Sequence, residues 1–144
     1  MPDRETLERA RQDAREGKSP STQAGEFVRE EMDHIREGKH GAASTKQAIA
    51  IGLSKARRAG VKLPPRGSAS TRKKAQQDIR ASKSNRKTSA KRSRATEGAL
   101  KREPHSAASR SSLSRQAKSV AASRGKRARS QSARKAAATR RRAA

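Results

Sequence analysis

Clusters of arginine and lysine are the residues of this chain whose spacing points most directly to a chemistry. They recur from residue 72 to the C-terminal end, with almost no acidic residue among them. A cation that reaches a nucleic-acid phosphate releases condensed counterions, and contacts with about ten phosphates give a log–log salt slope near −9. We therefore predict a DNA-binding surface made of Arg72, Lys73, Lys74, Arg86, Lys87, Lys91, Arg92, Arg94, Arg110, Arg115, Lys118, Arg124, Lys126, Arg127, Arg129, Arg134, Lys135, Arg140, Arg141 and Arg142.

The same residues do not favour the reading of base sequence. Sequence-specific recognition needs a few side chains held rigidly against base edges, and the pattern contains no zinc finger or recognition helix that would hold them. Stacking on bases also lacks its usual platform, because Phe27 is the single aromatic residue of the chain. We expect DNA binding that is indifferent to sequence, with RNA left open as a phosphate-bearing alternative.

Glu31, His34 and His40 form a second pattern. Carboxylate and imidazole groups three residues apart are used on bundle helices to bind metals. A metal site, however, needs three or four converging ligands, and a solvated acidic helix face over residues 26–37 explains these residues without one. We expect no metal and no cofactor.

The sequence offers no arrangement typical of an enzyme. No histidine is placed beside a serine by a recognisable motif, and no glycine-rich loop that cradles phosphates occurs. Cysteine is absent, and neither a membrane-spanning run nor a signal peptide is evident. We expect a non-enzymatic protein of the cytoplasm, associated with the nucleoid.

Charge divides the chain into two unlike halves. The net charge is +25 over 144 residues. Residues 1–66 hold 14 basic and 10 acidic residues, whereas residues 67–144 hold 24 basic and 3 acidic residues. Low hydrophobicity and high net charge are typical of chains that cannot offset their conformational entropy by burial. We therefore predict a long intrinsically disordered tail over residues 66–144, in which stretches such as 106–123 become helical only on phosphates.

Periodic apolar residues predict helices in the first half. Residues 3–16 suggest a marginal charged helix, and the spacing of Phe27, Met32 and Ile35 predicts a helix over 21–37 that ends at Gly38. Ser44 and Gln47 fit a capping box that starts a third helix over 45–59, with Gly60 as its C-terminal cap.

These elements predict a mainly α fold in three parts. Residues 1–20 form the marginal helix and a linker, 21–65 form a helical hairpin, and 66–144 form the tail. The hairpin places Phe27, Ile35, Ile49 and Leu53 between its helices. A core of about 40 residues usually needs support, so we expect a second copy of the chain or a protein partner to dock on it.

Residues 46–57, followed by Gly60 and preceded by Met32, Ile35 and Gly38, resemble a small bacterial domain family of unknown function. Members of that family are often described as plasmid-stabilisation or DNA-binding proteins. Residues 113–118 and 133–140 are similar to the basic extensions of such proteins and to histone-H1-like bacterial tails. The resemblance implies a DNA-associated role for the chain.

Two alternatives to DNA binding remain open on the sequence. In the first, the protein is an interaction adaptor or plasmid-maintenance component, whose hairpin carries the function. In the second, it is an RNA- or ribosome-associated basic protein. All three interpretations share a cationic second half, so they differ in the partner rather than in the chemistry of the charged side chains.

Overall fold

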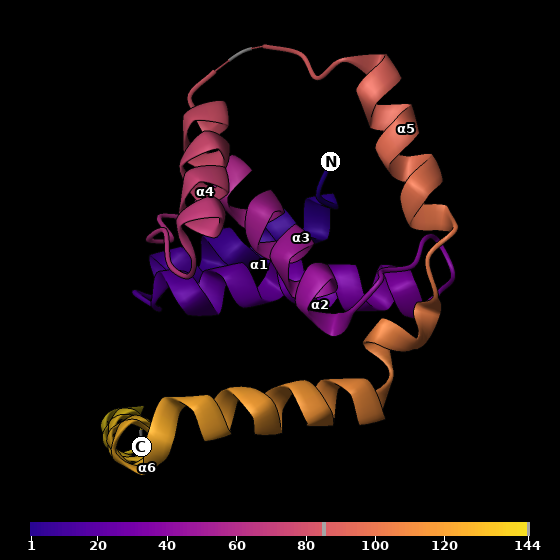
Figure 1. Cartoon of the computed structure of the whole chain (residues 1–144). Helices are drawn as coiled ribbons and strands as arrows, with labels where there is room; N and C mark the ends of the chain where they lie inside the picture. Colours follow the sequence, from indigo (N-terminus) through magenta and orange to yellow (C-terminus); the bar gives the residue numbers. More distant parts are fainter. Residues whose placement is uncertain (85, 144) are drawn as a thin grey trace. The chain divides into compact units, whose positions relative to one another are not determined.

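Six α-helices and one short 3-10 helix make up the computed structural model, which describes residues 1–84 and 86–143 (Figure 1). Their bounds are α1 Arg4–Arg15, α2 Pro20–Arg36, α3 Thr45–Arg58, α4 Ala69–Ser82, α5 Ala90–Lys101, η1 His105–Ala108 and α6 Arg110–Ala143. No strand occurs among the described residues. The chain divides into two units, residues 1–109 and 110–144.

The prediction of a long disordered tail is wrong. Helices α4, α5 and α6 occupy most of the region after residue 66, and helix continues to Ala143. Local signals explain the difference: Ser68 caps α4 by accepting a hydrogen bond from the Thr71 amide at 3.2 Å, and alanine, lysine and arginine all favour helix. The high net charge of this region bears on partners and solubility more than on local structure, so it does not prevent helix formation.

Helices α2 and α3 form the centre of the first unit. Ser19 and Ser44 cap them, and the amides of Thr22 and Gln47 donate to the two serine hydroxyls at 3.4 and 3.2 Å. Gly52 of α3 faces α2 so closely that a Cβ atom there would lie 2.7 Å from the Val28 Cα. The two helix backbones therefore meet at a position where only glycine fits.

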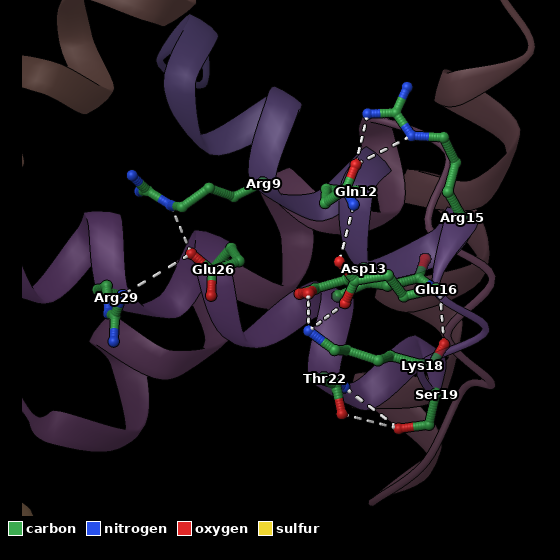
Figure 2. A network of polar contacts seen from close by, with 11 residues as sticks. Arg9, Gln12, Asp13, Arg15, Glu16, Lys18, Ser19, Thr22, Glu26 and Arg29 are labelled. Atoms are coloured by element: carbon green, nitrogen blue, oxygen red, sulfur yellow. Dashed lines mark hydrogen bonds and ion pairs between the residues drawn. The ribbon is translucent and has the colours of Figure 1, made fainter. Parts of the chain in front are cut away.

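Helix α1 lies against α2 through a small apolar core and a set of ion pairs. Ala10, Ala24 and Phe27 are buried together between α1, α2 and α3. Figure 2 shows the polar contacts beside this core, including Arg9 of α1, whose Nε lies 2.6 Å from an oxygen of Glu26 on α2. The helix that the sequence suggested to be marginal is thus held on both an apolar and a charged side.

Helix α4 is attached to α3 by a buried carboxylate. The side chain of Asp78 is 1% exposed and accepts hydrogen bonds from the Ser54 hydroxyl at 2.8 Å and the Arg58 Nε at 2.9 Å. Ala75, one turn earlier on α4, is 2% exposed. Part of the region predicted to be disordered is therefore packed on the hairpin.

Residues 100–108 cross the loop between α2 and α3. The amides of Gly41 and Ala42 donate to the carbonyls of Leu100 and Pro104 at 2.8 and 3.1 Å, and the Thr45 hydroxyl donates to the Ala107 carbonyl at 2.7 Å. Ala107 and Ala108 are buried. Helices α1, α4 and η1 of the same chain therefore extend the small core of the hairpin.

The second unit consists of α6. Its helix is interrupted at Gly125, where φ is +72° and ψ is 166°, a conformation that glycine adopts far more readily than other residues. The unit is thus two helical segments joined at one glycine. None of the described helices is both long enough and apolar enough to cross a membrane.

Candidate nucleic-acid interface

All twenty cations that the sequence assigned to DNA binding are exposed. Three of them lie on α4, two between α4 and α5, three on α5 and twelve on α6. The structure therefore displays eighteen of the twenty on helices rather than on a flexible tail. They are divided between the two units, eight in the first and twelve in the second.

Helix α6 is the densest part of this set. Residues 110–144 contain no aspartate or glutamate, so its twelve cations have no carboxylate side chain within their own unit. Beyond Gly125, the side chains of Lys126, Arg127 and Arg134 line one open groove together with Ser130 and Gln131. Five side chains that can donate hydrogen bonds, three of them charged, thus face the same side of one helical segment.

Cations of the first unit are placed differently, because many of them lie beside a carboxylate. Lys18 lies 2.8 Å from both Asp13 and Glu16 (Figure 2), and these contacts raise its pKa, the hydrogen bond with Asp13 contributing most. Among the predicted binding residues, Lys74 lies 3.6 Å from Asp78. Pairing of this kind cancels charge that would otherwise attract a polyanion, so α6 is the stronger candidate surface.

The dimensions of α6 suit a nucleic-acid groove. Residues 126–143 span about 27 Å at 1.5 Å per residue, and eight of the twelve cations lie in this stretch. A helix of about 10–12 Å diameter fits the roughly 12 Å major groove of B-DNA, which carries phosphates on both sides. Cations distributed around the helix can therefore reach phosphates on either strand.

A second polar site lies between the start of α1, α2 and α3. Glu31 is fully buried and Glu30 is 4% exposed, so the expectation that the acids of α2 all lie on a solvated face is wrong for these two. Lys55 of α3 reaches both, with Nζ 3.1 Å from Glu30 and 2.7 Å from Glu31. Burial opposes the charged form of Lys55, but the two carboxylates outweigh it and raise its pKa.

Both histidines of the early pattern line this second site. His34 Nε2 lies 3.1 Å from Asp3 Oδ2, and His40 Nε2 lies 3.0 Å from Glu31 Oε1. The hydrogen bond with His34 is the main cause that lowers the pKa of Asp3. Sequence spacing identified Glu31, His34 and His40, but it missed Asp3, because only the fold brings the start of the chain against α2.

Comparison with known proteins adds one finding. Residues 19–67 match a family of unknown function (DUF6496). The match covers α2, α3 and the turn that follows, which is the part of the chain where the sequence resembled a domain family of unknown function. No curated protein and no solved structure shows significant similarity to the chain.

The match carries no functional description. Its family is described only as one of unknown function, so the plasmid-stabilisation and histone-like interpretations of the sequence find no support and are set aside. The matched residues also end at 67, before α4 and α6. The match therefore assigns no function to α6.

Proposed function

We propose that this protein binds duplex DNA without sequence preference, through phosphate contacts made by α6. The observation that carries the proposal is the exposure of twelve cations on a unit with no acidic side chain. Such a surface attracts a polyanion and gains free energy from the counterions that binding releases. Binding of this kind would concentrate the protein on the nucleoid.

The side chains of α6 favour backbone contacts over base reading. Arginine and lysine surround the helix instead of forming one face, and no aromatic residue is available to stack on a base. A preformed helix also loses less conformational entropy on binding than a flexible tail would. Affinity should therefore depend strongly on salt and only weakly on the DNA sequence.

A charge-matched pair of full-length variants tests the proposal. One variant replaces four cations of α6, the groove residues Lys126, Arg127 and Arg134 and the neighbouring Lys135, with glutamine. The control replaces four exposed cations that already lie beside a carboxylate, Arg4, Lys18, Lys39 and Lys101. Both variants lose four positive charges, so a difference between them reports on position rather than on net charge.

The expected result is a selective loss in the α6 variant. If its four cations contact phosphates, the slope of log affinity against log salt should decrease by about 3 to 4, since each contact contributes about 0.9. The control should keep a slope close to that of the unmodified protein. Equal losses in both variants would refute a dedicated surface on α6, and tighter binding of structured RNA than of duplex DNA at fixed salt would favour an RNA partner.

The adaptor interpretation has no observation in its favour. An adaptor needs an uncovered apolar face, and among the described residues the exposed large apolar side chains are Met1 and Val120. The apolar side of the hairpin is covered by α1, α4 and η1. We therefore propose a single, non-catalytic binding role.

A further inference from the structure

We infer that the cluster between α1, α2 and α3 is a binding site for one divalent transition-metal ion, of which Zn²⁺ is the best match. The proposed ligands are Glu31, His34 and His40, and Asp3, which is hydrogen-bonded to His34, supports that ring from outside the ligand set. This inference is independent of DNA binding by α6.

Convergence of the ligand atoms is the first argument. One carboxylate oxygen of Glu31 and one ring nitrogen from each of His34 and His40 all lie within 4.8 Å of one another. Asp3 Oδ2 lies 3.1 Å from the Nε2 atom of His34. Ligand atoms about 2.0–2.1 Å from a tetrahedral zinc ion are roughly 3.3 Å apart, so a small closure of the Glu31, His34 and His40 atoms would place them around an ion.

The orientation of His40 is the second argument. Its Nδ1 atom lies 3.0 Å from the Gly41 carbonyl oxygen, which can only accept, so Nδ1 carries the proton. In the neutral ring, Nε2 then offers a lone pair on the side of Glu31. Metal-binding histidines are typically fixed in this way, with the second ring nitrogen donating to a backbone carbonyl or a carboxylate.

The environment of Glu31 is the third and independent argument. Both of its carboxylate oxygens are buried without a hydrogen-bond partner among the described residues. Lys55 Nζ forms an ion pair with one of these oxygens at 2.7 Å, and His40 Nε2 lies 3.0 Å from the other. The second contact is the one expected of two ligands of one ion, since each directs its lone pair at the ion and not at the other ligand.

Charge balance supports a divalent ion over a monovalent one. Asp3, Glu30 and Glu31 contribute three carboxylates, and Lys55 contributes one ammonium group. With both imidazoles neutral the cluster carries a net charge of −2, which one divalent cation cancels. The exposed Lys39 is left out of this sum because it pairs with Glu37 at 2.9 Å. Two imidazole ligands favour Zn²⁺ over Mg²⁺, which prefers oxygen ligands and retained water.

The site also has a structural consequence. Asp3 precedes α1, Glu31 and His34 lie on α2, and His40 lies in the loop before α3. The backbone amide of Asp3 donates a hydrogen bond to a carboxylate oxygen of Glu30 at 3.1 Å. A bound ion would therefore join α2 to the loop before α3, with Asp3 held through His34, and binding would add to the stability of the first unit.

The experiment uses untagged full-length protein stripped of metal with EDTA. Zn²⁺ is titrated by calorimetry, and the three histidine rings are followed by long-range proton–nitrogen NMR. We expect one ion per chain and altered ring-nitrogen shifts for His34 and His40, while exposed His105 stays unchanged. His34→Gln and His40→Gln should each weaken Zn²⁺ binding by about 100-fold or more, taking outer-shell effects of 10–100-fold as a lower bound. His105→Gln is the matched control and should bind as the unmodified protein does.

Several outcomes would overturn the inference. The first is that His34 and His40 signals stay fixed at a twofold excess of Zn²⁺, with the protein at about 100 μM. The second is that His105→Gln weakens binding as much as His40→Gln does. If a variant fails to fold, two measurements on the unmodified protein still test the site: the NMR titration and the visible absorption of the Co²⁺ complex. A tetrahedral Co²⁺ site gives intense visible bands that the octahedral hydrated ion lacks. Absence of such bands at saturating Co²⁺ would also overturn the inference.

Discussion

Replacing Asp78 with asparagine should release α4 from α3. The asparagine side chain has nearly the same shape, but it replaces one carboxylate oxygen by an NH₂ group that must face the Ser54 hydroxyl or the Arg58 guanidinium. Hydrogen bonds to charged groups contribute about 1.5–3 kcal/mol each. Because the Arg58 side chain is 48% exposed and screened by solvent, we expect the packing of α4 on α3 to lose about 2 kcal/mol of stability in total.

Amide hydrogen exchange measures this loss directly. If α4 opens as a local unit, its amides should exchange about 30-fold faster in Asp78→Asn, since each 1.36 kcal/mol is a factor of ten. Glu97→Gln is the control, because Glu97 pairs with Lys101 on the surface of α5 with 60% of its side chain exposed. That change should leave the exchange of the α4 amides unchanged, because the Glu97–Lys101 pair is exposed and screened by solvent. Exchange rates for α4 that are equal in the two variants would refute the role assigned to Asp78.

Three further predictions concern packing and pH. Gly52→Ala should destabilise the protein by about 1–3 kcal/mol in urea unfolding, because the added methyl group would clash with the α2 backbone. Gly25→Ala is the control and should stabilise the protein by about 0.5–1 kcal/mol, because the space around Gly25 is open. Stabilisation by both substitutions would contradict the close approach of α2 and α3. Thr45→Val should lower the free energy of unfolding by about 1 kcal/mol, because it removes the hydroxyl that donates to the Ala107 carbonyl of η1. Thr45→Ser keeps a hydroxyl and should retain most of that stability. Equal losses of stability in the two variants would exclude a role for this hydrogen bond. The pKa of Glu16 is lowered chiefly by its hydrogen bond with Lys18, so its stabilising contribution is present above the usual glutamate pKa and is lost as pH falls through the lowered value. Lys18→Met should raise the carboxyl titration midpoint of Glu16 in NMR, and an unchanged midpoint would disprove the cause.

The helices of the first half were predictable because their signals are local. The apolar stripe of α2, the Ser44 cap of α3 and the glycines that follow both helices are each contained within a few residues. Gly38 and Gly60 adopt φ values of +76° and +96°, the left-handed conformation expected of a helix C-terminal cap. Helices α2 and α3 accordingly lie within about one residue of the predicted bounds.

The packing of the second half was not predictable in the same way, because it depends on small residues and long-range contacts. Ala75, Ala107 and Ala108 bury little area each, and composition counts them as weakly apolar wherever they occur. In the sequence, Asp78 is an isolated acidic residue in a basic stretch. Its hydrogen-bond partners Arg58 and Ser54 lie 20 and 24 residues away. Such a contact has no periodic signature in the sequence.

The cationic residues were predictable as a set, since charge is visible in composition, but their arrangement was not. From the sequence alone, the basic clusters between Arg72 and Arg142 could not be distinguished from one another. The structure separates Lys74, which lies beside Asp78, from the cations of α6, whose unit has no acid. Likewise, Glu31 and His34 were visible as a spacing, while the burial of Glu31 depended on how α1 and α3 pack against α2.

The salt dependence of DNA binding by the full-length protein tests the central proposal most directly. Affinities for several unrelated duplexes should be measured between 50 and 300 mM salt. Engagement of eight to twelve phosphates predicts parallel lines with slopes of about −7 to −11. A slope near zero, or one duplex bound far more tightly than the others at every salt concentration, would contradict phosphate binding by α6.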